Sequence, residues 1–147
     1  MEDLSFNISI NASPEKVWNT LFTDANYPKW TAAFCSGSHA ITDWQEGSKA
    51  LFLDDKGRGM HGILEKVIPN EYMRIKGVGE VKDGQEVYDS EGAQACSGIE
   101  SYKLTPNGNG TNLHIELSGA DFPDEMLGFF NEAWPKALDA VKEIAEQ

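Results

Sequence analysis

The stretch LSFNISINASPEKVW, residues 4–18, decides the fold class, because it changes from a strand pattern to a helix pattern at a single break. The apolar residues of its first half alternate with polar ones, which predicts a strand over residues 4–11 with one buried face. Ser13 is a suitable N-cap, and Pro14 suits the first position of a helix. The chain therefore builds one half-buried strand and turns at once into a helix.

This helix carries one apolar stripe, because Val17, Trp18 and Leu21 lie at i, i+1 and i+4. Asp24 is placed to cap a second short helix. Aromatic residues lie on that second helix or just beyond it: Tyr27, Trp30 and Phe34. The sequence thus predicts two short helices directly after the first strand.

Residues 36–118 carry the signals of strands and turns. Turn sequences separate short runs rich in β-branched and aromatic residues, as in consecutive antiparallel hairpins. They predict six strands, or seven with the first. The clearest is TNLHIEL, in which Leu113, Ile115 and Leu117 face one side while His114 and Glu116 face solvent. The polar segment 86–97 is predicted to be a hairpin end and a loop.

After Pro123 the apolar period returns to 3.6 residues. This period predicts a long amphipathic helix to the C-terminus, with an apolar stripe of Phe130, Trp134, Ala137, Val141 and Ile144. Pro135 inside the pattern predicts a kink, or a helix that begins near Trp134. One long helix covers the inner face of seven strands only if the sheet curls around it. We therefore expect a single α+β domain over residues 1–147, with space between the helix and the sheet.

Composition and charge restrict the function. Lys and Arg number 12 and Asp and Glu 24, for a net charge of −12, and no basic patch interrupts the scattered cations. Nucleic acid is therefore not an expected partner. The first residues lack a secretory signal and no apolar run is long enough to span a bilayer, which predicts a cytoplasmic protein without membrane insertion. Cys35 and Cys96 are expected to be plain thiols.

Four segments carry a resemblance to a known family: INASPEKVWNTLFTDANYPKW, GSKALFLDDKGRGMHGILEKVIPNEYMRI, IESYKLTPNGNGTNLHIEL and WPKALDAVKEIAEQ. In this order and spacing they resemble the START-like (SRPBCC, helix-grip) superfamily, in the branch of the activator of heat-shock-protein-90 ATPase homologues. The resemblance implies a helix-grip fold, in which a curved seven-stranded antiparallel sheet wraps around the C-terminal helix, and a lone single-domain member of the branch. The superfamily includes lipid carriers, hormone receptors, polyketide cyclases and cochaperones, so fold and function are separate questions.

Motifs that suggest chemistry have simpler explanations here. Residues 57–62 spell GxGxxG but lead into a strand, so a hairpin turn is expected in place of a dinucleotide site. Asp54 and Asp55 are adjacent and point to opposite faces, as in a solvated turn. The spacing of histidines and cysteines predicts no metal site, and no motif predicts a cofactor.

His61 could point into a cavity near Tyr102, although alternation alone also allows it to face outward. Glu100 shares the parity of Tyr102, which makes a buried carboxylate conceivable. The candidate cavity residues, most of them aromatic, are Trp30, Phe34, Trp44, Phe52, Met60, His61, Tyr102, Phe129, Phe130 and Trp134.

Three functions follow from this cavity and the family resemblance. The leading one is non-catalytic binding of an apolar or aromatic small molecule. The second is a cyclase- or hydratase-type enzyme that uses the same cavity, with His61, Tyr102 and Glu100 converging on one wall. The third is a protein-interaction module that contacts a chaperone.

Overall fold

The computed structural model describes residues 3–119 and 122–147. Its elements are β1 (Leu4–Ile10), α1 (Pro14–Leu21), α2 (Tyr27–Thr31), β2 (His39–Ile41), β3 (Lys49–Leu53), β4 (Gly59–Ile68), β5 (Tyr72–Lys82), β6 (Gln85–Val87), α3 (Glu91–Ala95), β7 (Ile99–Asn107), β8 (Gly110–Ser118) and α4 (Asp124–Ala145). The predicted first strand, first helix and long last helix are all present. The α+β class is confirmed.

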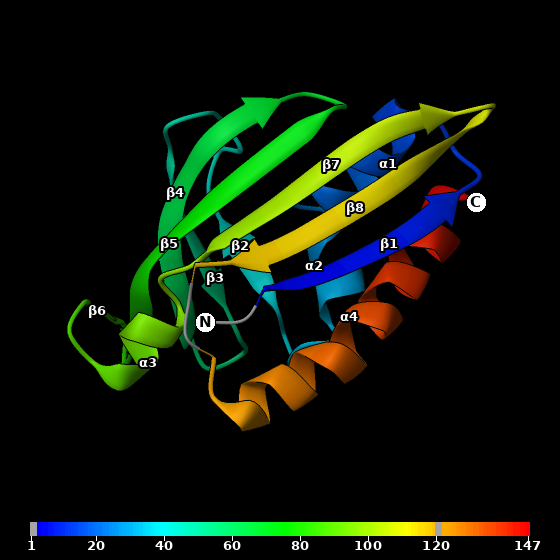
Figure 1. Ribbon diagram of the computed structural model, residues 1–147. Helices are drawn as coiled ribbons and strands as arrows, with labels where there is room; N and C mark the ends of the chain where they lie inside the picture. Colours follow the sequence, from blue (N-terminus) through cyan, green and yellow to red (C-terminus); the bar gives the residue numbers. More distant parts are fainter. Residues whose placement is uncertain (1–2, 120–121) are drawn as a thin grey trace.

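The strands form one curved antiparallel sheet (Figure 1) in the order β1-β8-β7-β5-β4-β3-β2, with β6 paired to β5. The sheet has eight strands, not seven. The additional strand, β6, and the short helix α3 lie in or next to the segment predicted as hairpin end and loop. Both are too short, at three and five residues, to leave a periodic pattern in the sequence.

Bulges help to curl the sheet. The register between β4 and β5 shifts between His61 and Gly62 and again between Leu64 and Lys66. Such shifts bend a strand and increase its twist. Gly62 pairs with Gly77 at the first shift, and a Cβ atom on Gly62 would meet the backbone of Lys76. The glycine that ends the GxGxxG motif therefore permits close strand packing, as expected for a hairpin.

The two early helices form with one change to the prediction. Ser13 caps α1, since its side chain accepts a hydrogen bond from the Lys16 amide at 3.2 Å. Asp24 does not cap α2: the N-cap is Asn26, which makes no side-chain capping bond. The Asp24 carboxylate instead accepts a hydrogen bond from the Trp44 indole at 3.0 Å.

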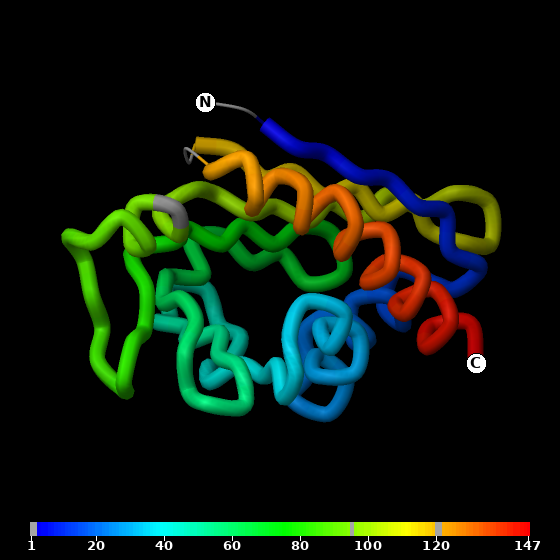
Figure 2. Tube along the Cα trace, turned by 90° about the horizontal axis from the view of Figure 1, so that it is seen from below, coloured from blue at the N-terminus to red at the C-terminus, as the bar shows by residue number. Residues whose placement is uncertain are grey.

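The long helix α4 lies on the concave side of the sheet. Viewed from below (Figure 2), α1 and α2 lie beside its C-terminal half, while β6 and α3 project at the opposite end of the molecule. Pro135 lies inside α4, so a helix that begins near Trp134 is wrong. Tertiary packing compensates for the missing backbone bond, because Trp134, Ala137 and Val141 are all buried in the core. No helix of the described residues is long and apolar enough to cross a membrane.

Candidate functional site

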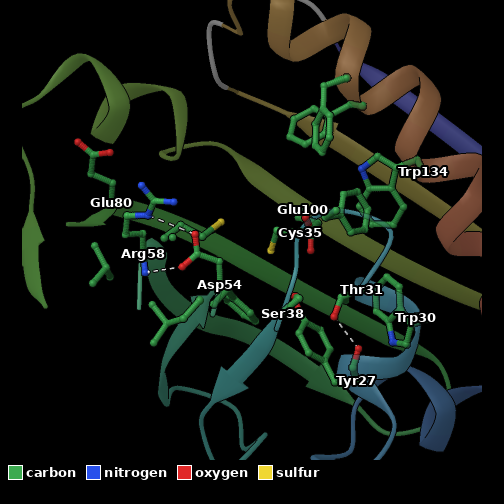
Figure 3. A pocket seen from close by; sticks show the side chains of 18 of the residues that line it. Tyr27, Trp30, Thr31, Cys35, Ser38, Asp54, Arg58, Glu80, Glu100 and Trp134 are labelled. Carbon is green, nitrogen blue, oxygen red and sulfur yellow. Dashed lines mark hydrogen bonds and ion pairs between the residues drawn. The ribbon is translucent and has the colours of Figure 1, made fainter. Parts of the chain in front are cut away.

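A cavity of about 510 Å³ separates α2 and α4 from the concave face of the sheet (Figure 3). We call it the main cavity. Eight of the ten predicted residues line it: Trp30, Phe34, Phe52, Met60, Tyr102, Phe129, Phe130 and Trp134. They come from α2 and the turn after it, β3, β4, β7 and α4. The structure thus brings eight of the predicted residues together around one space.

Rings from three elements hold the inner end of the cavity in place. The Trp134 ring lies 4.9 Å from Phe34, 6.1 Å from Trp30 and 6.1 Å from Tyr102, measured between ring centroids. Trp30 is fixed further because its indole N–H donates to the carbonyl of Leu21 at 3.1 Å. These contacts join α2, β7 and α4 into one rigid aromatic wall.

A carboxyl group lies within this wall. The Tyr102 hydroxyl donates to Glu100 Oε2 at 2.5 Å, so the two side chains share one face of β7, as their parity predicted. Burial disfavours the charged form and raises the pKa of Glu100, while the hydrogen bond from Tyr102 acts in the opposite direction. Burial, followed by the nearby Glu100 charge, raises the pKa of Tyr102 well above its usual value.

Tyr27 adds a second phenol to the main cavity. It is buried, and burial, followed by the charge of Glu100, raises its pKa well above the usual value. Sequence reasoning placed Tyr27 on the second helix but did not include it in the site. Its spacing of three residues from Trp30 could have identified it, because residues at i and i+3 lie on one helical face.

The outer end of the main cavity is charged. Asp54, Arg58, Glu80 and Lys82 line it, and Figure 3 shows the first three grouped apart from Glu100 and Trp134. Asp54 accepts hydrogen bonds from the Arg58 amide at 2.9 Å and the Arg58 side chain at 3.3 Å. The bond from the Arg58 amide is the main cause that lowers the pKa of Asp54. Asp54, which was expected in a solvated turn, thus also lies at the edge of the main cavity.

A smaller cavity of about 100 Å³, the side cavity, adjoins the main one. Met60, Glu100 and Phe130 line both spaces. Glu100 therefore borders open space on two sides, although the surrounding wall is mostly apolar.

Trp44 and His61 do not line the main cavity, which corrects two of the site predictions. The ring of Trp44 packs against the core, 5.4 Å from Tyr27 and 5.6 Å from Phe22 between ring centroids. His61 follows Met60, which faces the cavity, so His61 points to the opposite face of the strand.

On that opposite face, His61 is buried against the segment that contains β6. Its Nδ1 atom lies 3.4 Å from Glu86, and its ring lies 4.9 Å from that of Tyr88. The catalytic set that requires His61 beside Glu100 and Tyr102 is therefore not assembled. His114 takes the place expected of it on the wet face, 2.9 Å from Glu116.

The two cysteines and the potential metal ligands form no further site among the described residues. Cys35 and Cys96 are both free thiols, and burial raises the pKa of each, that of Cys96 to about 11. Within residues 3–119 and 122–147, no group of three or more His, Cys, Asp or Glu side chains is arranged to hold a metal ion.

Comparison with known proteins identifies a family. Residues 11–146 match the sequence model of the family described as Activator of Hsp90 ATPase homolog 1-like protein. No curated protein sequence matches the chain.

Several solved structures share the fold. Protein MLL2253 from Mesorhizobium loti has a TM-score of 0.75 at 18% identity, with 97% of this chain and 96% of that chain covered. The Aha1 dimer from Colwellia psychrerythraea has a TM-score of 0.74 at 22% identity, with 99% and 97% covered. DynU16, a protein in the dynemicin biosynthetic locus, has a TM-score of 0.71 at 14% identity, with 100% of this chain and 48% of that chain covered.

Proposed function

The chain belongs to the family of Activator of Hsp90 ATPase homolog 1-like proteins, and on that premise we propose that it binds an apolar or aromatic small molecule, without chemistry, in the main cavity. The observation that carries this proposal is the set of aromatic side chains around a cavity of about 510 Å³. Small-molecule sites typically measure about 300 to 1,000 Å³ and are mainly apolar with a few polar groups.

The amounts of free energy involved support the proposal. A ligand in this cavity removes its own surface and that of the rings from water, at roughly 25 cal/mol per Å² before the losses of association. The rings are already held by contacts such as the one between Trp134 and Phe34, so little ordering is needed on binding. A preformed apolar wall therefore lowers the cost of binding.

The test is a panel of fatty acids, flavonoids, sterols and aromatic polyketides, scored by melting temperature and tryptophan emission. A compound that binds only the folded protein adds about 2.7 kcal/mol of stability at a hundredfold excess over its Kd. We expect at least one compound to raise the melting temperature and quench emission, because Trp30 and Trp134 line the cavity.

A matched pair of variants localises that response. Phe129→Ala removes a ring from the cavity wall that is 45% exposed, so the protein should fold and lose affinity. Tyr88→Ala removes a ring that is 57% exposed on the other side of the sheet, and the response should persist. If no compound binds, the proposal fails and the chaperone-interaction function becomes the stronger candidate.

One observation favours the enzymatic alternative. The Glu100 carboxyl and the Tyr102 hydroxyl are in direct hydrogen-bond contact, as in a pair that moves a proton. The predicted third group, His61, does not join this pair, because it lies on the opposite face of β4. Incubation of the hits from the panel with protein, followed by mass spectrometry, separates the two functions: a binding protein returns each compound unchanged.

A further inference from the structure

Glu100 is the feature of the main cavity that hydrophobic binding does not explain. Its side chain borders the main and side cavities, and Tyr102 donates a hydrogen bond to one of its two carboxyl oxygens. Among the described residues, no Lys, Arg or His nitrogen lies within ion-pair distance of it. A carboxylate removed from water without a cation is costly.

Neither cation of the main cavity, Arg58 or Lys82, lies within ion-pair distance of Glu100. Arg58 is engaged by Asp54 at the outer end, and Figure 3 shows this pair on the other side of the cavity from Glu100. Glu100 therefore has room for a partner that comes from outside the chain.

The aromatic lining of the main cavity suits a positive partner. Phe129, which is 45% exposed, lines the cavity together with Phe34 and Phe130, and a cation over the face of such a ring is attracted by its quadrupole. The net charge of −12 also raises the local concentration of small cations around the protein. The negative net charge, the aromatic rings and the free carboxyl oxygen all favour a cationic ligand.

We propose that Glu100, supported by Tyr102, is the anchor for a protonated amine carried on an aromatic or polycyclic ligand, an inference that rests on the proposed function. The amine donates a charge-assisted hydrogen bond to the carboxylate, and the skeleton fills the apolar part of the main cavity. Burial raises the pKa of Glu100, so part of the binding free energy ionises the carboxyl, and a bound ammonium then favours the charged form. Tyr102 keeps the carboxyl oriented toward the space.

Three probes on one ring system test the proposal: naphthylmethylamine, naphthalenemethanol and naphthoate. They share the apolar skeleton and differ in the group presented to Glu100. The wild-type protein should bind the amine most tightly, the alcohol less tightly and the carboxylate least. We expect roughly tenfold or more between the amine and the carboxylate, as for hydrogen bonds to a charged group. Titration calorimetry at neutral pH measures the three affinities.

Two charge-matched variants locate the effect. Glu100→Gln keeps the volume and an acceptor for Tyr102, and should weaken binding of the amine by roughly tenfold while binding of the alcohol changes little. Glu116→Gln removes the same charge from an exposed position of β8 and should leave all three affinities unchanged. Circular dichroism checks that both variants are folded. If Glu100→Gln does not fold, the ranking of the three probes by the wild-type protein still tests the proposal.

The outcomes are distinct. Equal affinity of the wild type for amine and carboxylate overturns the proposed anchor while the apolar binding function stands. Equal loss of amine binding in both variants also overturns it, since a general effect of net charge would then explain the preference. If none of the probes and no compound of the larger panel binds, cavity binding itself fails, and the anchor fails with it.

Discussion

Each face of the sheet holds a titratable side chain, half-buried on the concave face and fully buried on the opposite one. On the concave face, Glu100 borders two cavities and has Tyr102 as its hydrogen-bond partner. On the opposite face, His61 is 2% exposed and lies between Glu86 and Tyr88. Glu100 faces open space on two sides, whereas His61 is enclosed by protein.

The difference shows which buried polar group has room for a ligand. The segment around β6 covers His61, and Glu86 provides a counter-charge that also contacts Lys49. The Nε2 atom of His61 has no hydrogen-bond partner in the described residues, and a Cβ atom on Gly79 would lie only 2.8 Å from it, so the Gly79 backbone packs closely against the imidazole. Glu100 has the opposite combination: open space and no counter-charge from the described residues.

The largest expected effect comes from breaking the concave wall. Trp134→Ala should destabilise the fold by about 3 to 5 kcal/mol, the usual cost of emptying a buried aromatic site. The ring is 2% exposed and packs on Phe6, Phe34 and Trp30. Urea unfolding measures the change. Trp134→Phe, which keeps a ring, should lose less, and an unchanged midpoint for Trp134→Ala would show that α4 does not close this face.

A second substitution probes the closed side. Gly79→Ala should cost about 1 to 3 kcal/mol, because an added methyl group overpacks a filled site. Its Cβ atom would meet the carbonyl of Val87 and the ring of His61. The control is Gly128→Ala in α4, where nothing lies within 4 Å of the new atom and helix propensity predicts a gain of up to about 1 kcal/mol. Thermal melts of both variants should shift in opposite directions, and a shared direction would contradict the close packing around His61.

Much of the concave face could be predicted from sequence. The alternation of residues 4–10, the Ser13 cap and the helical period of residues 124–145 all depend on local geometry, which the sequence records directly. Strand parity likewise placed Glu100 and Tyr102 on one face, because residues two apart on a strand point the same way.

The opposite face could not be predicted in the same way. Alternation shows that Met60 and His61 point apart, but which of them faces inward depends on the register between β4 and β5. The cover over His61 comes from β6, a polar strand of three residues whose sequence has no apolar alternation. Trp44 was misplaced because it sits in a loop at a positive φ of 61°, where no strand parity applies.

The third prediction concerns pH and the concave face. Burial raises the pKa of Glu100 in the folded protein, so the folded state holds the proton more tightly than the unfolded chain. The stability from this group is complete below the ordinary glutamate pKa of about 4.3 and is lost as pH rises through the raised value. Wild-type protein should therefore lose stability relative to Glu100→Gln as pH rises, which melting curves of both proteins from about pH 4 to 8 measure. A gain of wild-type stability relative to Glu100→Gln with rising pH would contradict the raised pKa of Glu100.

The smallest effect, and the sharpest contrast, is expected at Glu86 on the other face. Its pKa is lowered, first by the hydrogen bond from Lys49 and further by the charges of Lys49 and His61. The stability from Glu86 is therefore present above the ordinary glutamate pKa of about 4.3 and is lost as pH falls. Glu86→Gln should remove a contribution that grows with pH, which is the opposite slope to that of Glu100→Gln. Because Glu86 lies at the surface, salt should screen its effect. The effect of Glu100 arises from burial and should persist at high salt. Melting curves of the two variants across pH, at low and at high salt, measure both slopes. If both slopes vanish at high salt, Glu100 is solvated like Glu86, and the difference between the two faces disappears.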